Sequence, residues 1–179
     1  MTPVPFRHAT IQNAYHVADL DDAIARWHRL WGIGPFLVRR HIALPEVRYR
    51  GRPARLDISA AYVQCGSIMV ELVTQHDDEP SAFREVFSAG QEGFHHVAVL
   101  PDDYDRLLAE YARQGFEIVT ELRTASGRGA AYIDTRPMLG HMVEVYWPSA
   151  GLVALYREVD EAAKRWDGRQ LVVEVNPAG

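Results

Sequence analysis

The chain of 179 residues contains one cysteine, Cys65, so it can form neither an intramolecular disulfide nor a zinc site built from cysteines. It has no apolar run near the ~20 residues that span a bilayer, and residues 1–8 lack the apolar stretch of a secretory signal. An excess of positive charge is also missing, because 19 Lys and Arg stand against 24 Asp and Glu, a net charge of −5. We therefore expect a cytoplasmic protein that binds neither membrane nor nucleic acid.

The remaining composition is that of an ordinary globular protein. Apolar residues make up 47% of the chain and charged residues 24%, values typical of proteins with a buried core. The length corresponds to one domain of roughly 150 residues. We predict a single domain over residues 1–179.

An internal repeat indicates how this domain is built. Residues 60–63 (AAYV) recur as residues 130–133 (AAYI), and residues 69–72 (MVEL) recur as residues 142–145 (MVEV). The blocks follow one another in the same order in both halves of the chain. Because one short match can arise by chance but several matches in order seldom do, we interpret the halves as two copies of one module.

Each copy predicts a strand, a helix and three further strands. Apolar residues recur at helical spacing after Asp19 and after Asp103, which stand where N-caps belong, and Gly32 and Gly115 stand where the helices should end. The predicted helices cover 20–31 and 103–114, and the predicted strands cover 10–17, 35–42, 56–64, 67–74, 94–100, 116–123, 128–134 and 141–147. The fold class is therefore α+β, with two tandem βαβββ modules.

The module boundaries follow from the repeat. Module one covers about residues 8–75, a polar linker covers 76–92, module two covers about 93–148, and a C-terminal extension covers 149–179. The linker and extension predict a short helix over 81–87, a helix over 152–166, and a strand over 170–175 that lies at the sheet edge or is donated to a partner chain.

Four polar residues stand at equivalent positions inside apolar strands. Gln12 and His96 lie on the first strands of the two modules, and Glu71 and Glu144 lie on the last strands. A charged residue in an apolar strand is seldom buried unless it is paired or coordinated. If a pseudo-twofold axis relates the modules, the four side chains converge, and their donor set suits a divalent ion (Ni, Co, Mn, Fe or Zn) with positions open to water or substrate. The alternative is that each is an ordinary surface or core residue.

This layout resembles the vicinal oxygen chelate superfamily, which includes glyoxalase I, methylmalonyl-CoA epimerase, extradiol dioxygenases and bleomycin-resistance-type binding proteins. The resemblance covers residues 8–148 and is carried by 15–23 (YHVADLDDA), 69–73 (MVELV), 93–99 (GFHHVAV) and 140–146 (GHMVEVY). It implies a curved mixed sheet around a central metal cavity, commonly in a homodimer.

The resemblance also implies a ligand set and a reaction. Gln12, Glu71, His96 and Glu144 match the superfamily's metal-ligand positions, although many members have His where this chain has Gln12. That departure disfavours an extradiol dioxygenase, whose iron site uses two histidines and one carboxylate. A pair of glutamates favours a metal-dependent lyase or isomerase of the glyoxalase or epimerase type, which moves a proton on the carbon next to a carbonyl. We expect Glu144 to be the principal base and Glu71 to be a ligand or second base.

Two alternatives remain open: a metal-free small-molecule binding protein of the bleomycin-resistance type, and a dioxygenase with an unusual iron site. For the lyase or isomerase, the expected partner is a small-molecule carbonyl or acyl substrate, possibly acidic. Residues 39–55 hold six arginines against one acid, Glu46. These arginines either bind an acidic substrate or the phosphates of a CoA thioester, or pair with acids elsewhere in the chain.

Three further histidines are excluded from the predicted site. His95 and His141 lie an odd number of residues from His96 and Glu144 on the same strands, so they should point to the opposite face. His16 lies at an even spacing from Gln12 and faces either the cavity or the surface.

Overall fold

The computed structural model describes residues 9–123 and 129–175, and it contains the repeated order of elements expected from the sequence. Module one consists of β1 (Thr10–His16), α1 (Leu20–Trp31), β2 (Phe36–Arg39), β5 (Ile58–Cys65) and β6 (Ile68–Gln75). Module two consists of β7 (Gly93–Val99), α3 (Tyr104–Arg113), β8 (Ile118–Arg123), β9 (Gly129–Ile133) and β10 (Met142–Tyr146). The prediction of two βαβββ modules is confirmed.

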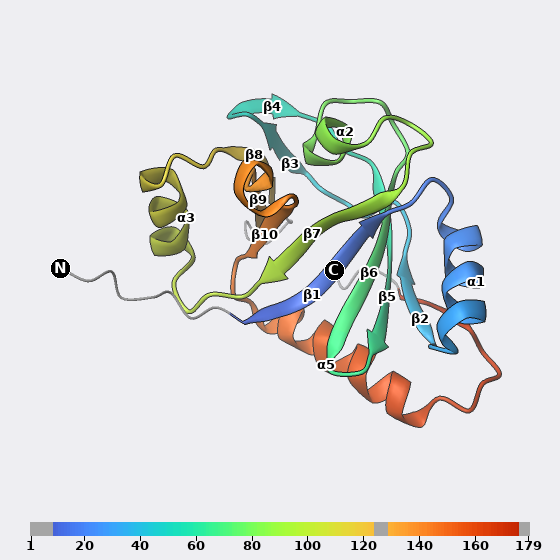
Figure 1. Ribbon diagram of the computed structural model, residues 1–179. Coiled ribbons are helices and arrows are strands. Elements are labelled where there is room, and N and C mark those ends of the chain that lie inside the picture. Colours follow the sequence, from blue (N-terminus) through green and yellow to red (C-terminus); the bar gives the residue numbers. More distant parts are fainter. Residues whose placement is uncertain (1–8, 124–128, 176–179) are drawn as a thin grey trace.

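The other elements are inserted between the strands of a module or follow the second module. They are β3 (Glu46–Tyr49), β4 (Arg52–Ala54), α2 (Ala82–Val86), α4 (Arg136–Leu139), α5 (Ala150–Arg165) and β11 (Val172–Glu174). All strands of the described residues join one curved, open mixed sheet in the order β11-β2-β5-β6-β1-β7-β10-β9-β8-β3-β4 (Figure 1). No helix in the described ranges is long and apolar enough to cross a membrane.

Both module helices begin where the sequence predicts. The side chain of Asp19 accepts a hydrogen bond from the backbone of Asp22, and that of Asp103 accepts one from Arg106, so each caps a free N–H of the first turn. After α1, Gly32 adopts a left-handed conformation with φ 65°, which a glycine takes without strain.

The two modules meet along their first strands. β1 pairs antiparallel with β7, and the last strand of each module runs parallel to its first strand, β6 beside β1 and β10 beside β7. The four strands at the middle of the sheet are therefore the four that carry the predicted ligand positions. The pseudo-symmetric pairing brings these positions together from distant parts of the sequence.

Two short edge pairings were not expected from the repeat. The β3–β4 hairpin belongs to the segment 39–55, and it pairs with β8 of module two, with Val47 opposite Leu122. The hairpin has only one buried residue on β3, Val47, so its apolar pattern is too weak to predict a strand. At the other edge, β11 pairs with β2, which makes the strand predicted over 170–175 part of this chain's own sheet.

Alternation along the strands divides the core into an outer and an inner part. On β6, Val70 and Leu72 face the outer side, where they pack with Ile24 of α1. Met69 and Val73 face the inner side. On the outer side of module two, α3 covers the sheet in the same way through Leu107.

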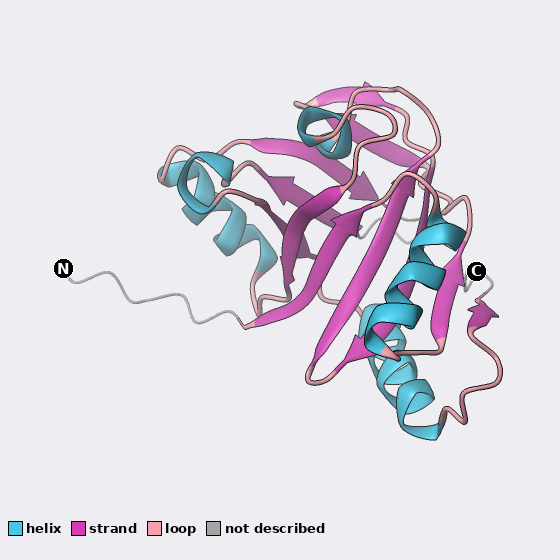
Figure 2. Cartoon of the chain, turned by 45° about the vertical axis from the view of Figure 1, so that its right-hand side comes forward, coloured by secondary structure: helices cyan, strands magenta, loops and turns pink. Residues whose placement is uncertain are grey.

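The inner face of the sheet is covered by the C-terminal extension. Leu155 and Val159 of α5, exposed by 6% and 0%, belong to one cluster with Met69 of module one and Met142 of module two. α1 and α5 both contact β5 and β6 but belong to different apolar clusters, so they lie on opposite faces of these strands (Figure 2). The extension thus completes the core where the sheet is concave.

Candidate metal centre

The four residues predicted as ligands meet on the inner face, and all are buried. Gln12 and His96 are 0% exposed, Glu144 is 3% exposed and Glu71 is 5% exposed. Nε2 of His96 lies 3.1 Å from Oε2 of Glu144 and 3.5 Å from Oε2 of Glu71. One donor atom from each of Glu71, His96 and Glu144 lies within 4.8 Å of the others, a spacing at which one ion can contact all three.

The buried charges of this cluster balance those of a divalent cation. Burial alone would lower the pKa of His96, but hydrogen bonds to Glu144 and Glu71 raise it to about 9. Burial also raises the pKa of Glu71, although the hydrogen bond from His96 acts in the opposite direction. With His96 neutral, as a metal ligand must be, two ionised carboxylates leave a charge of −2, which a buried site tolerates only beside a cation. The donor set therefore fits a divalent metal.

Gln12 belongs to the cluster, but its amide nitrogen faces the carboxylates. Nε2 of Gln12 donates to Oε2 of Glu71 at 2.6 Å, and Oε1 accepts from the hydroxyl of Tyr156 at 2.6 Å. Ligation through Oε1 would require the amide to turn over, after which the Tyr156 oxygen would accept from Nε2. Tyr156 was missed in the sequence because it lies on α5, outside the repeat.

His95 contacts the site, contrary to the prediction that it points to the opposite face. Ala14 of β1 lies opposite His96, and the next residue, Tyr15, lies opposite Phe94, so His95 is an extra residue in β7. Such a bulge interrupts the alternation of side chains, and this is why the spacing argument failed. His95 is 0% exposed, which also excludes a surface role.

The bulged His95 fixes the orientation of the His96 ring. Nε2 of His95 lies 3.0 Å from the carbonyl oxygen of Ala82, which can only accept, so this nitrogen carries the proton. Burial lowers the pKa of His95 well below its usual value, so its Nδ1 is free to accept. Nδ1 of His96 donates to it at 2.8 Å, which leaves Nε2 of His96 facing the two carboxylates.

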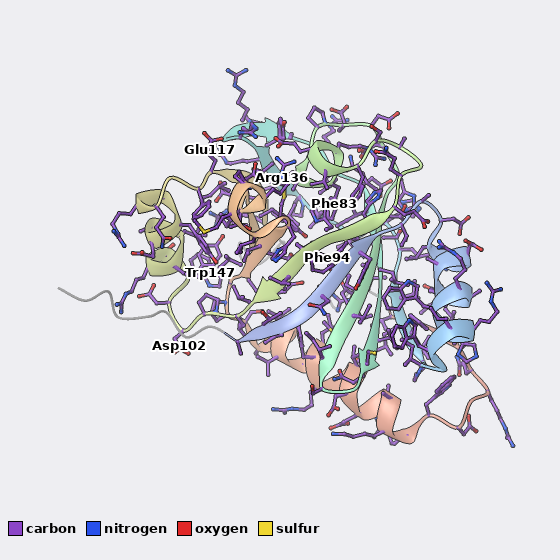
Figure 3. The ribbon with its side chains drawn as sticks, viewed as in Figure 1. Phe83, Phe94, Asp102, Glu117, Arg136 and Trp147 are labelled. Atoms are coloured by element: carbon purple, nitrogen blue, oxygen red, sulfur yellow. The ribbon has the colours of Figure 1, made fainter. Side chains whose placement is uncertain are left out.

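The inner face beside the cluster is closed by α5 and α2. Phe83 of α2, labelled in Figure 3, stacks on His95 with ring centroids 4.6 Å apart, and Tyr156 reaches Gln12 from α5. Two surface hollows lie elsewhere, one around Pro148 and one around Leu107, and neither is lined by any of the four predicted ligands. A substrate would reach the cluster only after part of this cover has moved.

The remaining histidines lie outside the cluster. His16 is buried, donates from Nδ1 to the Gln91 carbonyl at 2.9 Å, and stacks on Phe87. His141 bonds the Met142 carbonyl and stays half-buried, as expected for a residue on the other side of β10.

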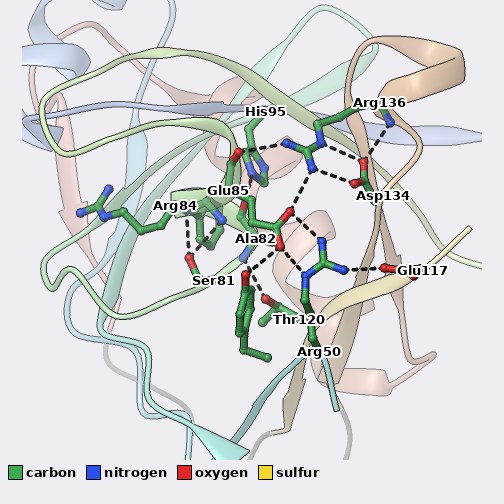
Figure 4. Close-up of polar contacts among 12 residues, drawn as sticks. Arg50, Ser81, Ala82, Arg84, Glu85, His95, Glu117, Thr120, Asp134 and Arg136 are labelled. Carbon is green, nitrogen blue, oxygen red and sulfur yellow. Dashed lines mark hydrogen bonds and ion pairs between the residues drawn. The ribbon is translucent and has the colours of Figure 1, made fainter. Parts of the chain in front are cut away.

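Several arginines of the segment 39–55 pair with acids of the same chain. Arg50 binds Glu85 of α2 through Nε at 2.7 Å and through Nη2 at 3.0 Å, and it also reaches Glu117 (Figure 4). Arg136 binds the same Glu85 carboxylate from α4. Arg40 similarly joins two acids at the sheet edge. This network ties the β3–β4 hairpin to module two.

Arg39 differs from these paired arginines. Arg39 lies two residues after Leu37 on β2 and opposite Ala60 on β5. Leu37 and Ala60 belong to the apolar cluster under α5, so Arg39 lies on the inner side of the sheet. Its Nε is buried and has no hydrogen-bond partner among the described residues. Buried donors are seldom left unpaired, so this Nε–H is available to an anionic group.

Comparisons with known proteins agree with this fold. The sequence model of the glyoxalase/bleomycin resistance protein/dioxygenase superfamily matches residues 11–132, and the chain belongs to this superfamily. No curated protein sequence matches.

Solved structures of low identity share the fold. The methylmalonyl-CoA epimerase from Mycobacterium tuberculosis is 20% identical with a TM-score of 0.51, over 80% of this chain and 90% of that one. A methylmalonyl-CoA epimerase from Streptomyces coelicolor, in complex with 2-nitronate-propionyl-CoA, is 15% identical with a TM-score of 0.52, over 79% and 94%. A hypothetical protein from Bacillus halodurans is 15% identical with a TM-score of 0.54, over 79% and 95%.

Proposed function

We propose that this protein is a divalent-metal-dependent isomerase or lyase that moves a proton on the carbon next to a carbonyl, in the manner of an epimerase. The observation that carries the proposal is the arrangement of Glu71 and Glu144, which reach the same Nε2 of His96 from equivalent strands of the two modules. Two carboxylates on either side of one centre suit a reaction in which a proton leaves one face of a carbon and returns to the other.

Glu71, His96 and Glu144 would hold the metal, with Gln12 as a fourth ligand through its oxygen. A metal bound there supplies positive charge that stabilises the negative charge developing on a carbonyl oxygen when the neighbouring carbon loses a proton. Glu144, ionised, would take the proton from one face of this carbon, and Glu71, which must carry a proton when the substrate is bound, would deliver that proton to the other face. Each turnover would therefore leave Glu144 protonated and Glu71 ionised. His95 keeps Nε2 of His96 directed at the centre throughout.

The substrate class we propose is an acidic acyl thioester. Methylmalonyl-CoA epimerases are among the structures that share this fold, and one of them is described in complex with methylmalonyl-CoA and NH4+. The unpaired Nε of Arg39 on the inner side supports a substrate with a carboxylate. Displacement of α5 would admit the substrate, because Tyr156, Leu155 and Val159 cover the cluster.

The test is exchange of the α-proton of methylmalonyl-CoA in D2O, followed by NMR with metal-loaded protein. We expect exchange with wild type, a loss of at least 100-fold in Glu144→Gln, and an increased KM in Arg39→Leu with partial recovery in Arg39→Lys. An undiminished exchange rate in Glu144→Gln contradicts the assignment of the base. Arg40→Leu, which removes two surface ion pairs, is the matched control for Arg39.

A metal-free binding protein is the second candidate, and one observation favours it. Without a metal, the raised pKa of His96 lets its ring carry a positive charge between Glu144 at 3.1 Å and Glu71 at 3.5 Å. Gln12 donates to Glu71 and accepts from Tyr156, so the cluster has compensating partners even without a cation. Tight binding of acyl-CoA without turnover, by protein that takes up no metal at this cluster, would favour this candidate.

We also propose that the whole chain is one domain that forms a cytoplasmic homodimer. The pairing of the module-one hairpin with β8 supports a single folding unit, which predicts one cooperative unfolding transition. Exposed apolar side chains support a subunit interface, since Leu30 is 77% exposed on α1 and Met138 is 70% exposed on α4. Light scattering of the purified protein measures the oligomeric state.

A further inference from the structure

A second group of potential ligands lies where three neighbouring strands of module one end. Asp57 directly precedes β5 and His76 directly follows β6. These residues continue the pairing of Ile58 with Gln75, because the backbone N–H of His76 donates to the carbonyl of Asp57 at 2.9 Å. His41 lies two residues after β2, which pairs with β5. The sheet itself therefore places the three residues side by side.

Their side chains have the spacing of donors around one ion. Nδ1 of His41 lies 2.8 Å from Oδ1 and 3.0 Å from Oδ2 of Asp57. The rings of His41 and His76 stack with centroids 4.4 Å apart, and one donor atom from each of the three residues lies within 4.8 Å of the others. Donors about 2.1 Å from a metal are about 3.4 Å apart around a tetrahedral ion and about 3 Å apart when adjacent around an octahedral one.

A buried serine holds both histidines in place. His41 has a left-handed backbone with φ 46°, which is uncommon for a residue with a side chain, and its N–H donates to Oγ of Ser59 at 2.9 Å. The same Oγ lies 2.7 Å from Nε2 of His76, and Ser59 is 1% exposed. When the hydroxyl of Ser59 accepts from Nε2 of His76, Nδ1 of His76 carries no proton and can bind a metal. Metal-bound histidines are usually supported by a hydrogen bond of this kind from the other ring nitrogen.

We propose that His41, Asp57 and His76 form a surface site for a divalent first-row metal, with Zn²⁺ as its occupant. Two imidazoles and one carboxylate are a donor set that these metals prefer, and the exposure of His41 and His76 leaves the other coordination positions to water. The bound ion would attach the segment after β2 to the ends of the paired strands β5 and β6. This segment leads into the β3–β4 hairpin.

This site is separate from the candidate metal centre on the inner face. Glu71 and His76 are five residues apart along β6, a distance of about 16 Å at about 3.3 Å per residue. The two sites share no residue, so each can be removed without changing the other. The inference does not depend on the proposed function.

The experiment counts metal sites in tag-free protein that has been stripped with a chelator. Zn²⁺ binding is measured by calorimetry, and Co²⁺ binding is measured by its visible absorption. Three proteins are compared: wild type, the surface variant His41→Asn/His76→Asn, and the central variant Glu71→Gln/Glu144→Gln. His28→Asn, on α1 and outside both clusters, is the control for loss of a histidine.

We expect two equivalents in wild type and in the control, and one in each of the double variants. The NMR signals of the His41 and His76 rings should shift with the equivalent that survives in the central variant. One equivalent in the central variant and none in the surface variant would support this site while contradicting the central one. A surface variant that binds as many equivalents as wild type, or a wild type that binds none, would overturn the proposal.

Discussion

Tyr156→Phe tests whether α5 is bonded to the candidate metal centre. The substitution keeps the ring, whose centroid lies 6.5 Å from that of Tyr146, and removes only the hydroxyl that donates to Oε1 of Gln12 at 2.6 Å. Gln12 is 0% exposed, so its oxygen loses a partner without gaining bulk water. Leaving a buried acceptor unsatisfied costs about 1–3 kcal/mol, more than the net value of an ordinary hydrogen bond.

We therefore expect the free energy of unfolding of the metal-free protein to fall by about 2 kcal/mol, which corresponds to a decrease in Tm of roughly 4–8 °C. Urea unfolding followed by circular dichroism measures it. Tyr111→Phe on α3 is the control, because it removes a hydroxyl far from the cluster, and it should change stability by less than about 0.5 kcal/mol. An unfolding free energy for Tyr156→Phe equal to that of wild type would show that the hydroxyl of Tyr156 does not stabilise the protein through Gln12.

Three further substitutions have expected outcomes. His95→Phe removes the acceptor that orients His96, so metal affinity at the centre should fall about 10–100-fold in a chelator competition. Glu85→Gln weakens the bonds from Arg50 and should cost about 2 kcal/mol at pH 7 in urea unfolding. Burial acts to raise the pKa of Glu85, but the hydrogen bond from Arg50 and the other contacts of the carboxylate lower it by more, and the pKa in the folded protein is below the ordinary value of 4.5. The ionised carboxylate therefore stabilises the folded state above about pH 4.5, and this stabilisation is lost as the pH falls through the lowered pKa. Gly129→Ala places a Cβ 1.8 Å from a backbone carbonyl oxygen of β8 and should cost about 3 kcal/mol in the same assay.

Each of these expectations has an outcome that would contradict it. Metal affinity that is unchanged in His95→Phe would show that the histidine pair does not orient the ligand. A loss in Glu85→Gln that is the same at pH 3 and pH 7 would exclude the ionised carboxylate as its cause. Gly151→Ala, on α5 with no atom within 4 Å of the added Cβ, is the control for Gly129 and should be neutral or up to about 1 kcal/mol more stable.

The repeat predicted the modules and the convergence of four residues because both depend on local apolar patterns. In the structure Glu71 alternates with Val70 and Leu72, which pack against α1, so the carboxylate lies on the opposite face of the sheet, where the repeat predicted that the four residues converge. The β3–β4 hairpin was not predicted, because Arg48 and its neighbours owe their strand conformation to β8, which is distant in sequence.

Features at the site that depend on tertiary structure could not be predicted. The bulge at His95 arises from the pairing of two modules, and no periodicity within a single strand indicates it. The contact of Tyr156 with Gln12 joins residues that are 144 positions apart. No sequence pattern connects His41 with His76, because the two residues come together only in the folded sheet, at the ends of three strands.

The proposed reaction depends on a divalent metal bound by Glu71, His96 and Glu144. The most direct measurement is the metal content per chain of tag-free His41→Asn/His76→Asn protein, purified without chelator, beside the same protein with Glu71→Gln/Glu144→Gln. We expect about one equivalent of Ni, Co, Mn, Fe or Zn in the first protein and none in the second. Absence of metal in the first protein, with no uptake when these ions are added, would show that the three residues hold no metal and would favour a metal-free binding protein.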